Sequence, residues 1–281
     1  MLWKGNEPML RNQNGLMEKE FLEQYTPGAY PRPSLTVDMI VFSTDKRDSN
    51  NYRKLPTQQL QVLLIRRGGH PYLGKWALPG GFVEPEETVG QAANRELMEE
   101  TGLADQYLEQ LYTFSTPGRD PRTWVVCCAH MALVNREKLS ITSGDDATDA
   151  AWFDLHLENG DTLLRLESER EILCAKIDPD NIAPEKSKII ENTGIAFDHP
   201  KMIVHALRRL RDKIEYTDLA FHFAPEYFTL TELQNTHEAI LGRKLIPAVF
   251  RRKIAAAVEE TEQYAAAKGH RPSKLYRRKH K

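Results

Sequence analysis

The chain has 281 residues, of which 41% are hydrophobic and 28% charged, and its formal net charge is −2. The hydrophobic share is enough for real cores, so this length suits one large domain or two modest ones. No apolar run approaches membrane-spanning length, and the polar N-terminus contains no signal-peptide core. Three cysteines, Cys127, Cys128 and Cys174, form neither a metal-ligand spacing nor an even disulfide framework. We therefore expect a cytoplasmic protein with no membrane partner.

The net charge hides an asymmetry along the chain. Residues 201–281 contain 17 Lys and Arg against 9 Asp and Glu, a net charge of +8, which leaves −10 for the first 200 residues. An acidic part joined to a basic part indicates two tasks, one of which involves contact with a polyanion.

The first two thirds of the chain predict a layered domain behind a polar arm. Residues 1–33 are typical of such an arm, with a short helix near residues 18–25. Apolar patterns predict strands at residues 34–43, 59–66, 108–114, 123–134 and 147–153. Strands around one long helix indicate an α/β domain. Residues 156–198 are charged and contain a turn signal, so we treat them as an insertion, with an extra hairpin as one possibility.

The long helix is predicted at residues 89–101. Thr88 with Gln91 three residues later is a capping-box start, and Gly102 is suited to the left-handed conformation that ends a helix. A Gly-Gly pair, at residues 80 and 81, and an acidic loop precede this helix. These three parts together form the most informative segment of the chain.

Three glutamates crowd one face of this helix. Glu96, Glu99 and Glu100 stand at i, i+3 and i+4 and therefore project together. Crowded carboxylates raise each other's pKa unless a positive charge intervenes. Oxygen-only ligands select a hard cation, so we expect magnesium or manganese. Glu87 precedes the helix, where a carboxylate suits the positive helix end, and it can also fold back to hold Arg95.

The segment resembles the signature of the Nudix hydrolases. The spacing runs Gly81, five residues, Glu87, seven residues, Arg95-Glu96, an aliphatic residue, one residue, Glu99-Glu100, one residue, Gly102 and an aliphatic residue. A solvated acidic helix is the simpler alternative, but it does not explain agreement at so many fixed positions. The resemblance implies an α/β/α sandwich and metal-assisted cleavage of a nucleoside diphosphate linked to another group.

The same resemblance implies roles for the signature residues. It implies metal binding by the side chains of Glu96, Glu99 and Glu100 and the backbone carbonyl of Gly80. It implies that Arg95 and Glu87 brace the loop and helix and do not react. The general base stays open between a signature glutamate such as Glu99 and a residue of a later loop, and the weaker candidates are Glu84, Asp145 and Asp146.

Candidate substrate residues lie outside the signature. Arg119, Asp120 and Arg122 occupy a loop bounded by proline and glycine, where arginines suit bidentate contacts to phosphate or ribose oxygens. Arg66 and Arg67 end a predicted strand and can act in the same way. The alternative for each arginine is an ordinary surface charge. Likewise Trp76 or Tyr112 either stacks on a base or packs in the core.

The spacing of this loop resembles the ADP-ribose pyrophosphatase branch of the Nudix hydrolases. The resemblance rests on Pro117, about this far past the signature, and on the Arg-Asp-Pro-Arg run at residues 119–122. It implies ADP-ribose or a similar nucleotide as the substrate or effector. Oxidised-nucleotide sanitation also fits the signature, but it leaves the arginine loop and the basic C-terminal part without a role.

The C-terminal part predicts a helix-turn-helix. A capping box at Thr229 opens a helix that Gly242 ends, and Pro247 suits the first turn of the next helix. That second helix carries Arg251, Arg252 and Lys253 where a recognition helix presents them. The tail predicts a basic wing that contacts phosphates through Arg271, Lys274, Arg277 and Arg278. The alternative is that this basic helical part mediates dimerisation or only forms a charged surface in contact with solvent.

Several segments resemble the Nudix-related transcriptional regulators of NAD metabolism, namely residues 31–38, 195–199, 228–234, 247–253 and 271–277. The resemblance implies a Nudix domain followed by a winged helix-turn-helix domain, a homodimer, binding to double-stranded DNA, and ADP-ribose as the ligand that weakens DNA binding. We expect an N-terminal arm at 1–33, a Nudix domain at 34–199 with the insertion 156–198, and a winged-helix domain at 200–281.

Two functions from different classes follow. The first is a magnesium-dependent hydrolase that cleaves the pyrophosphate of ADP-ribose or a relative and is fused to a DNA-binding winged helix. The second is a regulator that senses ADP-ribose and has little or no hydrolase activity. The complete signature favours the hydrolase. The intact basic C-terminal part means that the regulator stays a candidate.

Overall fold

The computed structural model of the protein describes residues 10–47, 56–102, 106–136, 147–178, 180, 183–265 and 272–279. The chain forms two compact units, Met1–Pro33 and Ser34–Lys281. The first contains the helix α1 (Glu18–Gln24), close to the predicted short helix, and a 3₁₀ turn at Pro27–Ala29. No described helix has the length and apolar character to cross a membrane.

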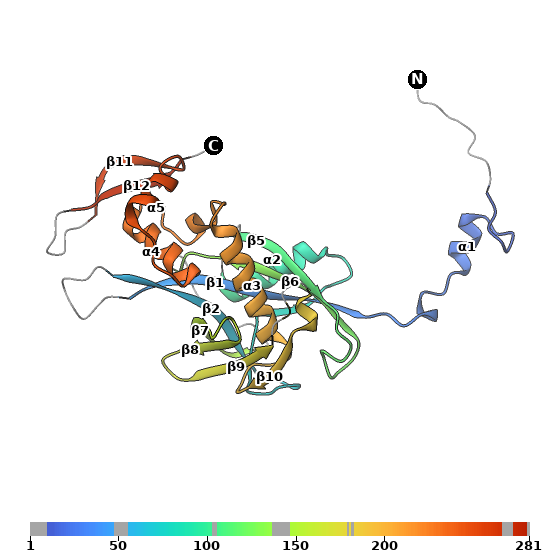
Figure 1. Cartoon of the computed structure of the whole chain (residues 1–281). Helices are drawn as coiled ribbons and strands as arrows, with labels where there is room; N and C mark the ends of the chain where they lie inside the picture. The colour runs from blue at the N-terminus through green and yellow to red at the C-terminus, as the bar shows by residue number, and fades with distance from the viewer. Residues whose placement is uncertain are drawn as a thin grey trace, which may run out of the picture. The chain divides into compact units, whose positions relative to one another are not determined.

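A mixed β-sheet is the centre of the second unit (Figure 1). Its strands lie in the order β10-β9-β8-β7-β2-β1-β6-β5, with β3 paired to β2 and β4 paired to β1. Only β1 and β6 pair in parallel among the described strands. The strands are β1 (Ser34–Arg47), β2 (Thr57–Arg67), β3 (Trp76–Ala77), β4 (Gly80–Phe82), β5 (Tyr107–Phe114), β6 (Val125–Leu133), β7 (Ala147–Glu158), β8 (Leu163–Glu167), β9 (Ile172–Asp178) and β10 (Lys188–Asn192).

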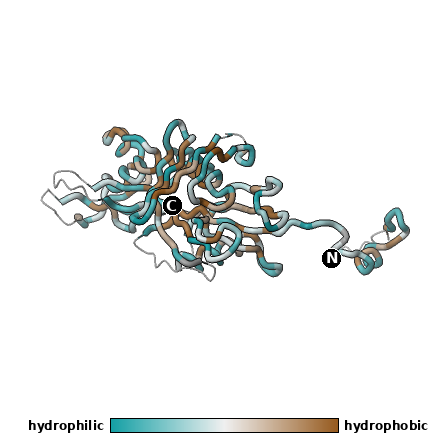
Figure 2. The backbone as a smooth tube through the Cα atoms, turned by 90° about the horizontal axis from the view of Figure 1, so that it is seen from below, coloured by the Kyte–Doolittle hydropathy of each residue, from teal (hydrophilic) through white to brown (hydrophobic). Residues whose placement is uncertain are grey.

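Alternation along β1 builds two cores on opposite faces of the sheet. Val37, Met39 and Val41 pack with the helix α2 (Val89–Thr101), whereas Ile40 and Phe42 belong to the core beneath α3 (His199–Ile214). Such alternation is the period-two pattern of a strand that is buried on both sides. The α/β/α layering is therefore confirmed, and Figure 2 shows hydrophobic segments gathered where the strands run side by side.

The charged segment 156–198 continues the sheet. The strands β8, β9 and β10 add in antiparallel order beyond β7, so this segment supplies three strands and not a single hairpin. Alternating burial along β9 shows why, since its residues 173, 175 and 177 face the core while their neighbours are more exposed. The segment thereby supports one end of α3, which packs on β9 and β10.

The C-terminal part consists of three short helices and a two-stranded sheet. They are η4 (Leu219–His222), α4 (Leu230–Leu241), α5 (Pro247–Ile254), β11 (Val258–Tyr264) and β12 (Lys274–Arg278). Two helices followed by a hairpin match the predicted winged helix-turn-helix. Because α3 contacts both the large sheet and α4, the domain boundary that we place at residue 200 stays a prediction.

Candidate functional site

The sequence sets α2 in place through its two ends. The Thr88 side chain accepts a hydrogen bond from Gln91 N at 3.3 Å, and Gln91 Oε1 accepts one from Thr88 N at 2.8 Å. Gly102 ends the helix with φ of 69°. Ala92, Ala93 and Leu97 on the buried face pack onto β1. The opposite, acidic face is therefore held beside the Gly-Gly pair.

Arg95 joins the preceding loop to the helix. Its Nη2 lies 2.8 Å from Glu87 Oε1, and its Nη1 lies 2.8 Å from Glu96 Oε1. Nη2 also donates to the carbonyl of Phe82, while Glu84 N donates to Glu87 Oε1 at 2.9 Å. The hydrogen bond from Arg95 is the main reason why the pKa of Glu87 is lowered from its ordinary value. The guanidinium thus fixes the loop against the first turns of α2.

The three helix glutamates differ in exposure. Glu96 and Glu100 are buried, whereas the Glu99 side chain is 53% exposed. Burial raises the pKa of Glu96, and the negative charges of Glu99 and Asp38 add to that rise, while Arg95 opposes it. Among the described residues, no group of three His, Cys, Asp or Glu is already gathered as a metal centre. The donors are all oxygens, and a divalent cation would relieve their repulsion, so they fit magnesium chemically.

Two glycines let the sheet approach these charges. A Cβ at Gly81 would lie 2.2 Å from Glu96 Oε1, and a Cβ at Gly80 would lie 2.2 Å from the carbonyl oxygen of Val37. Gly80 also has φ of 155°, a conformation that side chains disfavour. A larger residue at Gly80 would clash with the backbone of β1, and one at Gly81 would push the Glu96 carboxylate out of its place. The Gly-Gly pair is therefore required by close packing.

A pocket of about 130 Å³ opens beside Gly80 and Gly81. Residues from five parts of the chain line it, and those with polar or aromatic side chains are Thr36, Asp38, Arg67, Phe82, Arg119, Asp120, Arg122, Phe197 and His199. The pocket thus combines three guanidinium groups with two aromatic rings next to the acidic face of α2. These are groups that suit a phosphorylated ligand with a planar ring.

A cluster of paired charges forms the floor of this pocket. The Arg119 side chain is only 5% exposed and makes a two-point contact with Asp198, at 2.7 Å and 3.2 Å. Its Nη2 also lies 3.6 Å from Asp38 Oδ2, which accepts a hydrogen bond from Cys127 Sγ at 2.9 Å. Buried charges need such partners, so the cluster holds the Arg119 guanidinium in one orientation.

His199 is a neutral member of the same cluster. Its Nδ1 accepts a hydrogen bond from Leu78 N at 2.9 Å, which leaves the ring proton on Nε2. Burial lowers the pKa of His199, and the carboxylates of Asp38 and Asp198 only partly offset this effect. Nε2 lies 3.8 Å from Asp38 Oδ2. The imidazole therefore presents an N–H group toward the acidic side of the pocket.

The structure brings together most of the predicted substrate residues. Arg119, Asp120 and Arg122 line the pocket, and Arg122 Nη2 lies 2.8 Å from Asp120 Oδ2. Arg66 does not line this pocket, because its Nε donates to the carbonyl of Gly74 and its guanidinium lies over Trp76. Its neighbour Arg67 lines the pocket instead, since successive residues of a strand face opposite sides.

The two proposed stacking aromatics do not line this pocket. Trp76 is 2% exposed and packs edge-on against Phe153, with ring centroids 5.0 Å apart. Tyr112 donates a hydrogen bond to Glu185 and contacts Phe114. Trp76 thus has the core role that we left open for it. The weaker base candidates Asp145 and Asp146 lie outside the described residues.

Three pocket residues were given no role from the sequence. Asp38 lies on β1, whereas Asp198 is the N-cap of α3 and His199 is its first residue, so the two positions are far apart in the chain. The signal was present, because residues 31–38 and 195–199 both carry the resemblance to the regulators of NAD metabolism. Only the fold shows that these two segments meet.

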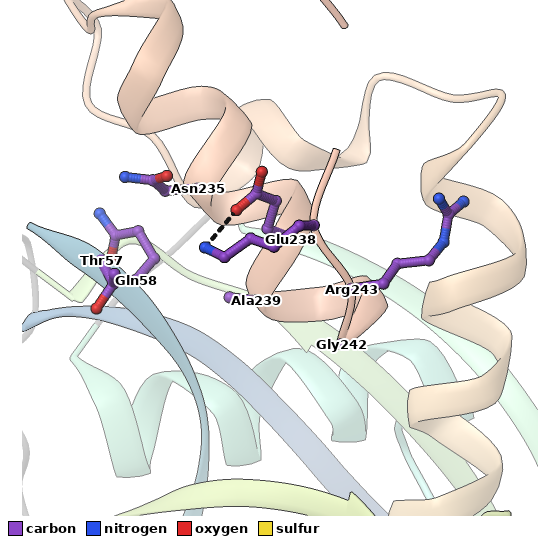
Figure 3. Close-up of a pocket in the computed structure, with 8 residues that line it drawn as sticks. Thr57, Gln58, Asn235, Glu238, Ala239, Gly242 and Arg243 are labelled. Carbon is purple, nitrogen blue, oxygen red and sulfur yellow. Dashed lines mark hydrogen bonds and ion pairs between the residues drawn. The ribbon is translucent and has the colours of Figure 1, made fainter. Parts of the chain in front are cut away.

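The helix-turn-helix is seated on the large sheet near the start of β2. Asn235 Nδ2 donates to the carbonyl of Pro56 at 2.8 Å, and Lys46 Nζ lies 3.1 Å from Glu232 Oε1. Figure 3 shows the cavity of about 200 Å³ at this junction, where Lys244 pairs with Glu238 at 2.7 Å. The contacts come from β1, β2 and α4, so they attach the C-terminal part to the sheet.

The helix α5 exposes its basic residues. Phe250 is buried against the ring of His237, at 5.0 Å between centroids, and this contact fixes α5 on α4. Arg251, Arg252 and Lys253 are exposed, and no hydrogen bond or ion pair joins their side chains to another part of the chain that the structure describes. Three cations thus stand free on one short helix.

The hairpin carries its cations in pairs. Lys274 Nζ lies 2.6 Å from Glu260 Oε2, and Arg277 pairs with Glu259. Arg278 lies 3.1 Å from Asp218 and stacks over a phenylalanine ring. Arg271, the fourth predicted contact of the hairpin, lies outside the described residues. The predicted wing is present as a structure, but its Lys274, Arg277 and Arg278 already pair with carboxylates.

Family models and relatives match both halves of the chain. The model of the NUDIX domain matches residues 53–173, and the model of the NrtR DNA-binding winged helix domain matches residues 220–278. The chain is 36% identical over 264 residues to the ADPR responsive transcriptional repressor NtrR of Acinetobacter baylyi, covering 92% of this chain and 88% of the relative. It is also 36% identical to the ADP-ribose pyrophosphatase of Methanocaldococcus jannaschii, over 52% of this chain and 75% of that enzyme.

Two solved structures are similar over nearly the whole length. A MutT/nudix family protein from Enterococcus faecalis has a TM-score of 0.71 and 32% identity, with 94% of each chain covered. NrtR from Shewanella oneidensis, solved with a 27mer DNA, has a TM-score of 0.62 and 31% identity, with 87% of this chain and 93% of that chain covered. This chain therefore belongs to the NrtR family, in which a Nudix domain is joined to a winged helix domain.

Proposed function

We propose that this protein hydrolyses the pyrophosphate of ADP-ribose or a close relative with magnesium, and that it binds double-stranded DNA through its winged helix. One observation carries the proposal. The complete signature places Glu96 against Gly81, beside a pocket that Arg67, Arg119 and Arg122 line. The relatives named as a pyrophosphatase and as an ADPR responsive repressor support the ligand class.

The chain's residues divide the work as follows. Glu96, Glu99, Glu100 and the carbonyl of Gly80 would hold magnesium or manganese, which neutralises the pyrophosphate and lowers the pKa of a bound water. Arg119 and Arg122 bind phosphate or ribose oxygens, and Asp120 orients Arg122. Arg95 and Glu87 hold the loop on the helix. Arg67 joins this set from the geometry of the pocket.

We assign the general base to Glu99. Of the three helix glutamates it is the one that solvent reaches, since Glu96 and Glu100 are buried. A base must lie within hydrogen-bond reach of the attacking water, directly or through one more water. The exposed carboxylate of Glu99 can reach a water beside α2, whereas the buried carboxylates of Glu96 and Glu100 are shielded from solvent.

The regulator without hydrolysis is the second candidate. It is favoured by the relative from Acinetobacter baylyi, because that protein is named a repressor and aligns with 92% of this chain. In that case the pocket senses ADP-ribose, and the bound ligand weakens the contact with DNA. We further propose a cytoplasmic homodimer for both candidates, which light scattering of the full chain would test.

The deciding experiment measures AMP release from ADP-ribose, with and without magnesium, alongside NADH, diadenosine polyphosphates and 8-oxo-dGTP. Magnesium-dependent cleavage that is fastest with ADP-ribose supports the hydrolase. Binding of ADP-ribose without turnover would leave the regulator. Preference for 8-oxo-dGTP would overturn the ligand assignment. A parallel gel-shift assay with duplex DNA, with and without ADP-ribose, tests the second activity independently.

A further inference from the structure

The exposed face of α5 has a definite order of side chains. Phe250 marks the buried side, and a residue two positions away on a helix is turned by about 200°. Ala248 and Arg252 therefore point directly away from the body of the protein, four residues apart and one above the other. Arg251 and Val249, one residue on either side of Phe250, flank this central line by about 100°.

Arg252 is the cation on this line. It is exposed and makes no ion pair or hydrogen bond with the described residues, as is also true of its neighbours Arg251 and Lys253. A guanidinium without a competing carboxylate keeps its full donor fork for a partner. In contrast, Lys274, Arg277 and Arg278 of the hairpin are paired with Glu260, Glu259 and Asp218.

Apolar exposure beside the arginine is the second observation. Val249 is 50% exposed, and Ile246, which precedes the helix, is 69% exposed. Ala248 between them is also exposed. Apolar side chains beside free cations, at the start of α5, suit a partner surface that carries methyl groups among hydrogen-bond acceptors. The major groove offers that combination where thymine lies near guanine.

We propose that Arg252 reads a guanine through O6 and N7, that Ala248 and Val249 contact thymine methyl groups, and that Arg251 contacts a phosphate. The proposal rests on the DNA binding proposed above and adds the division between base contact and phosphate contact. Ala248 and Arg252 are about 6 Å apart along the helix axis, which corresponds to about two base steps. The preferred site therefore contains a thymine within about two base pairs of a guanine.

Two charge-conserving variants on adjacent exposed positions test the division. Arg252→Lys keeps the charge but loses the two-point contact with guanine, and Arg251→Lys keeps a phosphate contact. The full-length protein and both variants would each select duplexes from a random 20-base-pair library, read by sequencing. We expect a guanine-containing motif from the wild type and from Arg251→Lys. The Arg252→Lys variant should lose preference at that guanine, by roughly ten-fold or more in relative affinity.

Base analogues test the apolar contacts on the selected duplex. Uracil in place of thymine removes only the C5-methyl group. We expect the wild type to bind more weakly when uracil replaces the thymine near the guanine. Replacement of a distant thymine should leave its affinity unchanged. Val249→Ser should reduce this difference between thymine and uracil.

Three results would overturn the assignment. One is an unchanged motif with Arg252→Lys, the second is an equal loss of guanine preference with Arg251→Lys, and the third is no response to uracil. If the wild type binds no duplex at all, the proposed DNA binding fails together with this inference. If it binds duplexes without sequence preference, only the base-reading assignment fails. Arg251→Ala should weaken binding to all sequences alike and lower the salt slope by about one.

Discussion

The arginines of the pocket and those of α5 differ in their burial and in their partners. In the pocket, Arg119 is buried and held by Asp198 and Asp38. On α5, Arg251 and Arg252 are exposed and make no ion pair with the described residues. In the proposed function, a ligand in the pocket would meet a guanidinium with a fixed direction, whereas DNA would meet side chains that can adapt. Fixed charges favour selection of one small molecule, and free charges favour affinity for a polyanion.

Replacing Glu99 should have the largest effect. Glu99→Gln keeps the shape of the side chain but cannot take a proton from water, so ADP-ribose turnover should fall by about 10²–10⁴-fold. DNA binding should be unchanged, because Glu99 lies on α2 and the cations that we propose for DNA contact lie on α5 and in the hairpin. AMP release and gel shift on the same preparation provide the measurements. Equal loss of both activities would indicate that Glu99 is needed for folding.

Removing the buried guanidinium should be the next largest effect. Arg119→Met leaves Asp38 and Asp198 buried without their cation, which should lower the free energy of unfolding by about 3–5 kcal/mol. The control is Arg251→Met on the exposed helix, which should change stability by less than about 0.5 kcal/mol. Urea unfolding followed by circular dichroism compares the two. Similar values for both variants would contradict the distinction between fixed and free arginines.

The helix and the hairpin should differ in their contribution to DNA affinity. Arg251→Ala with Arg252→Ala removes two free cations and should weaken binding to any duplex by roughly ten-fold or more. Lys274→Ala with Arg277→Ala removes two cations that already neutralise Glu260 and Glu259, so the loss should be smaller. Binding isotherms at one salt concentration provide the comparison. A larger loss from the hairpin variant would show that those ion pairs open on DNA.

The smallest of these effects should be on the thermal stability of the protein at acid pH. Burial, together with Arg209 and Arg208, lowers the pKa of His205 to about 4 from an ordinary 6.5. The folded state therefore favours neutral His205, and this stabilisation is present above pH 6.5 and lost as the pH falls toward 4. The melting temperature should decrease over that range, and His205→Gln should make the decrease shallower. An identical pH profile for the variant would exclude His205 as a contributor.

The sequence was sufficient where local rules decide the structure. The capping box at Thr88 and the stop at Gly102 follow from spacing alone, and they give α2 its observed bounds, while the alternation along β1 gives the two faces of the sheet. The pocket needed the fold, because Asp38 and Asp198 are 160 positions apart in the chain and both pair with Arg119.

Register and pairing were likewise beyond local rules. The sequence does not tell whether Arg66 or Arg67 lines the pocket, because this depends on which face of β2 is turned toward the pocket. The sequence shows equally basic segments on α5 and in the hairpin, and only the positions of Glu259, Glu260 and Asp218 reveal which cations are neutralised.

One helix belongs to both halves of the protein. In Figure 1, α3 crosses the sheet; it begins with His199 in the pocket, and near its other end Arg211 Nε donates to the carbonyl of Ile240 in α4. A genetic screen would therefore find two kinds of lesion. Changes on α2 or α5 would separate the two activities, whereas changes in the buried side of α3, such as at Leu207, would remove both at once.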